Sequence, residues 1–180
     1  MSQVYVTGIG FVTSIGNECN AVERSLRQME SGIGLHPELQ VDTSPVKVAG
    51  IIRDFDLTSL DPEDWIYPDR YRVRRDVIRS FSPHVLYAYC AMSQAIENAN
   101  LTENDLTDPE CGLYTASGGS MRSVHKHFEK MDQRGVMACN PLAIVSSVAG
   151  TLSFNLVALF GIRGFSTGMA SACASSGHSL

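Results

Sequence analysis

Two stretches of the chain repeat apolar residues at the spacing of an α-helix. In residues 81–99 and again in residues 142–159, an apolar side chain recurs every three or four positions. This spacing places the apolar side chains on one helix face, so we expect two long amphipathic helices. Asn140 and Pro141 are suited to begin the second helix and Gly161 to end it. Further helices are expected over residues 17–30 and 121–134.

Short runs rich in Val, Ile and Thr indicate buried strands. They lie at residues 4–12, 111–116 and 161–170, with another short strand within 46–52. Strands and helices alternate along the chain, which favours an α/β class with a buried mixed or parallel sheet. The length and composition suit a single domain, in which residues 33–68 form an excursion over the surface.

Composition narrows the function classes. The chain is 44% hydrophobic and 18% charged, and its net charge of −5 with a pI near 5.5 argues against a nucleic-acid partner. Five cysteines, an odd number without a CxxC pair, favour a reduced compartment over disulfides or a metal site. We see no signal peptide, and the longest apolar stretch contains Ser and Asn, so we expect a cytoplasmic protein without a membrane span.

Glycine-rich turns do not indicate a cofactor. Gly8, Gly10 and Gly16 lack the spacing of a dinucleotide-binding loop, and the turn at residues 117–120 (SGGS) lacks the Lys of a phosphate-binding loop. No cofactor and no metal is therefore expected.

Residues 171–180 (SACASSGHSL) hold the candidate nucleophile. A strand that ends before Cys173 and a helix that begins there would place the thiol at a helix N-terminus, where the thiolate is favoured. A free cysteine more often acts as a small buried hydrophobe, so the local pattern leaves both interpretations open. His178 follows by five residues and would not share a helix face with Cys173, so we expect a structural or polar-network role for it.

A resemblance decides between these interpretations. The segment SACASSGHS resembles the active-site segment of the β-ketoacyl-acyl-carrier-protein synthases, the condensing enzymes of fatty-acid synthesis. VYVTGIGFVTSIGN (4–17) is similar to the opening strand and turn of that family. RSLRQMESGIG, AIENANL, GLYTASGGS and NPLAIVSSVAGTLS follow in the family's order, so the resemblance covers nearly the whole chain. One departure is Gly164-Phe165, where the family commonly has Gly-Pro.

The resemblance implies a fold and a reaction. The fold is the amino-terminal half of a thiolase-like layered αβαβα architecture. The reaction is a decarboxylative Claisen condensation, in which Cys173 takes an acyl group from an acyl thioester and the enolate of malonyl-acyl-carrier protein attacks it. The N–H of Cys173 would stabilise one oxyanion, and a histidine pair would complete the site.

Further residues take roles from the resemblance. Gly118 and Gly119 would line the acyl pocket, and Val145 would face either the core or the acyl pocket and dimer interface. Residues 70–79 hold five Arg and one Asp, either a solvated face or the docking surface for the acidic acyl carrier protein. Arg74 and Arg75 are the candidates for docking. A homodimer is also implied.

None of the five histidines matches the family's histidine pair, which lies in the second half of a chain about twice this long. We therefore expect residues 1–180 to be an amino-terminal ketoacyl-synthase domain truncated inside its active-site helix, and to aggregate when expressed alone. The alternatives are a polyketide-type ketosynthase, a non-catalytic partner subunit that would lack the cysteine, and a generic cysteine hydrolase.

Overall fold

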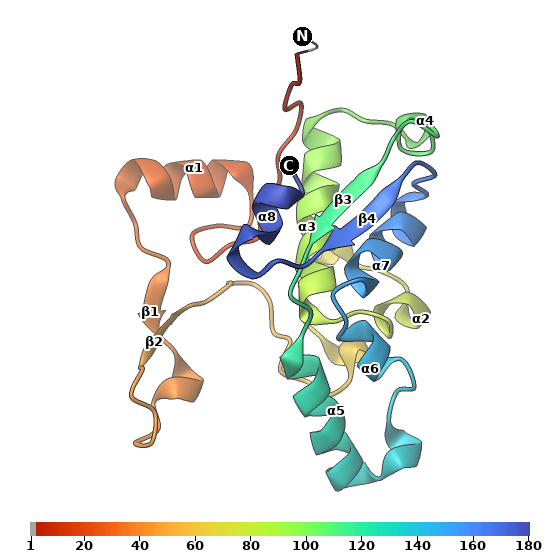
Figure 1. Ribbon diagram of the computed structural model, residues 1–180. Coiled ribbons are helices and arrows are strands. Elements are labelled where there is room, and N and C mark those ends of the chain that lie inside the picture. Colours follow the sequence, from red (N-terminus) through yellow and green to blue (C-terminus); the bar gives the residue numbers. More distant parts are fainter. Residues whose placement is uncertain (1–2) are drawn as a thin grey trace. The chain divides into compact units, whose positions relative to one another are not determined.

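The computed structural model describes residues 3–180, which divide into two compact units (Figure 1). Unit 1 comprises residues 3–55 and 90–100, and unit 2 comprises residues 56–89 and 101–180. Helix α3 (Pro83–Asn98) contributes residues to both units.

Unit 1 is built around one helix and one hairpin. Its further elements are α1 (Cys19–Gln28), β1 (Ile33–Leu35), a 3₁₀ turn (Pro37–Leu39) and β2 (Val48–Gly50). The two strands pair in antiparallel fashion, with Gly34 opposite Ala49. The helix predicted over residues 17–30 and the strand predicted within residues 46–52 are both present, each shorter than predicted.

The strand predicted over residues 4–12 does not form. Instead, side-chain amides of α3 bond three of its backbone groups: Asn98 Oδ1 accepts from the Ile9 N–H at 3.1 Å, and the Gln94 side chain bonds both the N–H and the carbonyl of Phe11. Among residues 3–180 no strand pairs with this segment, and its Val4 and Val6 are exposed. The glycines allow close approach to α3, since a Cβ on Gly10 would lie 1.9 Å from the Ala91 carbonyl oxygen.

Unit 2 contains the parallel strand pair. Strand β3 (Leu113–Ala116) lies beside β4 (Ser166–Met169), with Leu113 opposite Ser166 and Ala116 opposite Met169. The connection between the strands carries α5 (Met121–Arg134), a 3₁₀ turn (Val136–Ala138), α6 (Ala143–Ser146) and α7 (Thr151–Phe160). Helix α7 packs against both strands (Figure 1).

The remaining elements of unit 2 are short. They are 3₁₀ turns at Pro62–Asp64, Asp69–Tyr71 and Ala172–Ala174, and the helices α2 (Arg75–Ile78), α4 (Glu103–Leu106) and α8 (Ser175–His178). The unit's core holds apolar side chains from α2, α3, α7 and the link between α2 and α3, namely Ile78, Phe81, Val85, Leu86, Leu152 and Leu156.

Local capping hydrogen bonds set where α4 and α5 begin. Thr102 and Asp105 form a reciprocal capping box at the start of α4. Ser120 accepts a hydrogen bond from the Ser123 N–H at the start of α5. Helix α5 therefore spans the predicted residues.

The long helix predicted over residues 142–159 is interrupted between α6 and α7. Asn140 accepts from the Leu142 N–H before α6, and Gly161 ends α7 in a left-handed conformation, as predicted. Between the helices, the Ser147 carbonyl accepts a hydrogen bond from the Ser120 N–H at 2.8 Å. A tertiary hydrogen bond thus occupies a carbonyl that a continuous helix would use in its own backbone hydrogen bonding.

Candidate active site

Cys173 lies on the turn that joins β4 to α8. Its side chain is exposed and forms no disulfide, so nothing within residues 3–180 buries it. The helix predicted to begin at Cys173 instead starts with the 3₁₀ turn Ala172–Ala174, and α8 begins two residues later. The preceding strand is half-buried rather than buried, because one pairing partner covers it among the described residues.

The backbone of this turn is sharply bent. Ala172 has a φ of +46°, in the left-handed region that L-residues seldom adopt. The N–H groups of Ala174 and Ser175 close the turn on the carbonyls of Ser171 and Ala172. The Cys173 N–H takes no part in these two bonds, so it remains a donor that can face a reacting carbonyl oxygen.

The glycine turn at residues 117–120 lies at the same end of the strand pair. The Ser117 N–H donates to the Met169 carbonyl at 3.1 Å, which continues the ladder one residue past the end of β3. Because parallel strands end at the same edge, the turns that follow β3 and β4 are neighbours there. A Cβ on Gly118 would meet nothing within 4 Å, whereas Gly119, at a φ of +77°, packs against Ser147.

Val145 lies on α6 with 55% of its surface exposed. The described residues therefore do not bury Val145, and both alternatives for it stay predictions. Ile144 and Val148 beside it are also about half exposed, so this part of unit 2 presents apolar side chains on its surface.

The histidines lie on several elements. His178 is exposed at the end of α8 among residues 3–180. His36 directly precedes the first 3₁₀ turn, His84 lies on α3, and His125 and His127 lie on α5. Among residues 3–180, no cluster of three or more His, Cys, Asp or Glu side chains is arranged to hold a metal ion.

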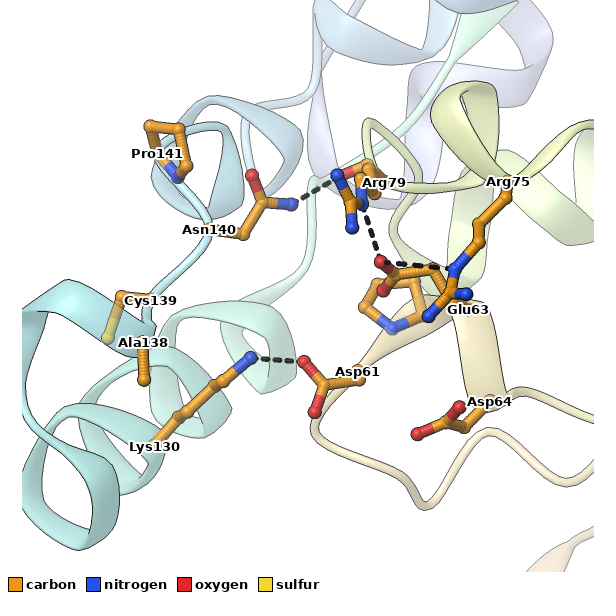
Figure 2. A pocket seen from close by; sticks show the side chains of 11 residues that line it. Asp61, Glu63, Asp64, Arg75, Arg79, Lys130, Ala138, Cys139, Asn140 and Pro141 are labelled. Carbon is orange, nitrogen blue, oxygen red and sulfur yellow. Dashed lines mark hydrogen bonds and ion pairs between the residues drawn. The ribbon is translucent and has the colours of Figure 1, made fainter.

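A polar cavity of about 410 Å³ lies on unit 2 (Figure 2), and the residues that line it are distant in sequence from Cys173. Its walls come from the 61–64 segment, α2, α5 and residues 138–141. Asp61 pairs with Lys130 and, at 3.0 Å, with Arg134. Glu63 accepts from Arg79 Nε at 2.5 Å, and the Asn140 side chain donates to the Arg79 carbonyl at 2.6 Å.

These ion pairs keep both acids charged. The hydrogen bond from Lys130 is the main cause that lowers the pKa of Asp61 below its ordinary value of 3.8. Burial raises the pKa of Glu63, but the hydrogen bond and charge of Arg79 outweigh burial, and the pKa lies below 4.5. The cavity lining therefore carries paired charges of both signs, an arrangement invisible to sequence patterns because Asp61 and Lys130 are 69 positions apart.

Arg74 and Arg75 lie at the start of α2. Their side chains are 79% and 77% exposed. Arg74 pairs with Asp76 at 2.8 Å, and Arg75 Nε lies 4.0 Å from Glu63. The pair of Arg74 with Asp76 is exposed on both sides and contributes little free energy, so an acidic partner can displace it.

The comparisons identify the family. The family described as "Beta-ketoacyl synthase, N-terminal domain" matches residues 1–180. The chain belongs to the β-ketoacyl synthase family. It is 33% identical to 3-oxoacyl-[acyl-carrier-protein] synthase 1 of Haemophilus influenzae over 100% of the chain and 42% of that protein. The chain thus spans less than half the length of the curated relatives it matches.

Solved ketosynthases show the same fold. A β-ketoacyl synthase from Burkholderia phymatum superposes with a TM-score of 0.72 at 24% identity, over 99% of this chain and 41% of that one. A type II polyketide ketosynthase solved with its acyl-carrier protein and a hexaketide gives 0.68 at 15% identity, over 97% and 43%. The structure is thus the amino-terminal part of a thiolase-like ketosynthase fold. Among residues 3–180, no helix has both the length and the apolar character needed to cross a membrane.

Proposed function

We propose that Cys173 is the nucleophile of a β-ketoacyl-acyl-carrier-protein synthase that elongates fatty acids. The observation that carries this proposal is an exposed thiol on a sharply bent turn after a strand, in a chain of this family. The sulfur attacks the carbonyl carbon of an acyl thioester. A new carbon–sulfur bond forms, the bond to the carrier's sulfur breaks, and the released carrier thiolate takes up a proton.

The later steps use the acyl-enzyme. Malonyl-acyl-carrier protein loses CO₂, and the resulting enolate carbon attacks the acyl carbonyl and displaces the Cys173 thiolate. The Cys173 N–H is proposed to bind the oxyanion that forms at the acyl carbonyl. The histidine pair of the family would stabilise the enolate; the curated relatives, of which this chain spans about 40%, are long enough to carry it elsewhere.

The acyl chain is proposed to pass beside the glycine turn. Gly118 supports this, because the space where its side chain would lie is open and its turn follows β3 at the edge where β4 runs into the cysteine turn. Gly119 and Val145 are proposed to line the same pocket. Val145 is exposed and could contact either an acyl chain or a second protomer.

An acyl carrier protein is the proposed partner, with Arg74 and Arg75 in its docking surface. Both side chains extend into solvent, and the names of the relatives include this carrier. We also propose a homodimer, supported by the exposed apolar residues Ile144, Val145 and Val148, and a cytoplasmic location, supported by five cysteines that form no disulfide.

The proposal is tested by condensation with the complete protein. Acyl- and malonyl-acyl-carrier protein should yield β-ketoacyl-carrier protein and CO₂, and Cys173→Ala should abolish the product. Thioester cleavage without a new carbon–carbon bond would support a cysteine hydrolase instead. Absence of any acyl transfer would support a non-catalytic subunit. The solved polyketide ketosynthases are below 25% identity and show the fold alone, so they do not favour a polyketide substrate.

A further inference from the structure

One buried hydroxyl holds the turn that carries Cys173. Ser175, the first residue of α8, is 8% exposed and is the only buried residue within 171–180. Its Oγ accepts a hydrogen bond from the Ser171 N–H at 2.7 Å and donates one to the Ala172 carbonyl at 2.7 Å. The hydroxyl therefore bridges the two sides of the bend.

The second of these bonds acts on the peptide group of the nucleophile. The Ala172 carbonyl and the Cys173 N–H belong to one planar peptide unit and point in opposite directions. Fixing the carbonyl therefore fixes the direction of the N–H. The Ser175 N–H donates to the same carbonyl, so two donors from one residue set the plane.

The conformation needs such support. Ala172 at a φ of +46° is unfavourable for any residue with a Cβ, and an exposed turn would relax without a restraint. The neighbouring Ser176 is exposed and lies outside this network, since its carbonyl accepts from Ser179 on the far side. The two adjacent serines thus have the same side chain, but only Ser175 is buried and bonded to the backbone of the turn.

We propose that Ser175 is a positioning residue that orients the Ala172–Cys173 peptide, and with it the oxyanion-binding N–H, for acyl transfer to Cys173. This inference rests on the proposed function. The Ser175 Oγ bonds backbone groups of the turn, and its proposed role needs no contact with the substrate. It acts through the backbone of the nucleophile, so its loss should slow the chemical step and leave carrier binding unchanged.

The test is single-turnover acylation of the complete protein by acyl-carrier protein, followed by intact mass. Ser175→Ala should lower the maximal acylation rate roughly 10- to 100-fold, the cost of a small misplacement at a reacting centre, with the half-saturating carrier concentration unchanged. Ser175→Thr keeps the hydroxyl and should restore most of the rate. Ser176→Ala is the matched control and should acylate like the parent.

The outcomes separate the two proposals. If the parent protein takes up no acyl group on Cys173, the proposed function fails. If the parent is acylated and Ser175→Ala stays within about twofold of it, the positioning role is overturned. A change in the half-saturating carrier concentration alone, with the maximal rate unchanged, also overturns it. So does a Ser175→Thr variant that is acylated as slowly as Ser175→Ala.

If the Ser175→Ala protein does not fold, a second variant still tests the inference. Adding Ala172→Gly removes the cost of the positive φ, because glycine adopts it freely. The double variant should fold and still acylate slowly, since nothing then fixes the peptide plane. Acylation at the parent rate, or failure of the double variant to fold, would contradict the inference.

Discussion

Gly119 lies so close to Ser147 that a Cβ on the glycine would be 2.4 Å from the serine's carbonyl oxygen. The same carbonyl accepts the Ser120 N–H, so the turn after β3 is hydrogen-bonded to the break between α6 and α7. We call this contact of residues 119–120 with Ser147 the joint. The joint lies at the edge of the strand pair where the cysteine turn also begins. A substitution there tests whether the glycine is required by packing.

Gly119→Ala should therefore destabilise the protein. The alanine would adopt a φ of +77° and collide with backbone, at a cost of at least about 1–3 kcal/mol in the free energy of unfolding. Gly118→Ala is the matched control, because nothing lies within 4 Å of its added Cβ. Denaturant unfolding of both variants measures the difference. Equal stabilities would show that the turn moves aside and that the joint is not rigid.

This joint also shows where sequence reasoning stops. The α5 boundaries and the α4 capping box are predictable because the hydrogen bonds that set them lie within four residues. The break in the 142–159 helix is not, since the Ser120 N–H that binds the Ser147 carbonyl at the break lies outside the helix. In the same way, the run at residues 4–12 has strand propensity, but Gln94 and Asn98 supply its hydrogen bonds.

The candidate site was predictable to a different extent. Cys173 was identifiable from its motif and the turn around it. Ser175 was hidden as one of two adjacent serines, because only burial and its two backbone partners distinguish it from Ser176. The ion pairs of Asp61 were also hidden, because they join segments distant in sequence.

Asp61→Asn should destabilise unit 2. The Lys130 side chain is only 11% exposed, so removing its counter-charge leaves a mostly buried cation, at a cost of about 1–3 kcal/mol. The pKa of Asp61 is lowered, so its contribution is complete above about pH 3.8 and is lost as the pH falls further. The free energy of unfolding should therefore be measured near pH 7.

The matched control for that variant is Glu23→Gln, which breaks an exposed pair with Arg27 on α1 and should change stability little. If Asp61→Asn is as stable as this control, the ion pairs of Asp61 beside the cavity of Figure 2 do not contribute to the stability of unit 2.

His84 should make stability fall in mild acid. Burial lowers the pKa of this histidine in the folded protein, and its Nδ1 shares a 2.8 Å hydrogen bond with the buried Ser82 hydroxyl. The unfolded chain then binds more protons, so stability falls as the pH drops through 6.5. His84→Gln should flatten the dependence of the melting temperature between about pH 7.5 and 5.5. The exposed His125→Gln serves as control, and an unchanged slope in the His84 variant would assign the dependence to other groups.

Reversing the charges of Arg74 and Arg75 to Glu should raise the KM for acyl-carrier protein steeply at low salt, with kcat nearly unchanged. The reason is loss of long-range attraction to an acidic partner, and added salt should reduce the difference between variant and parent. Reversing Arg24 and Arg27 together to Glu, both exposed on α1, changes the net charge by the same amount and serves as the control. An unchanged KM would remove the two arginines from the docking surface.

The most direct measurement is the site of acylation. The complete protein, incubated with acyl-carrier protein and digested, should carry the mass of one acyl group on the peptide that contains Cys173. Cys173→Ala should carry none, although Cys19, Cys90, Cys111 and Cys139 remain. An acyl group on another cysteine, or equal labelling of the Cys173→Ala protein, would contradict the assignment of the exposed thiol after β4 as the nucleophile.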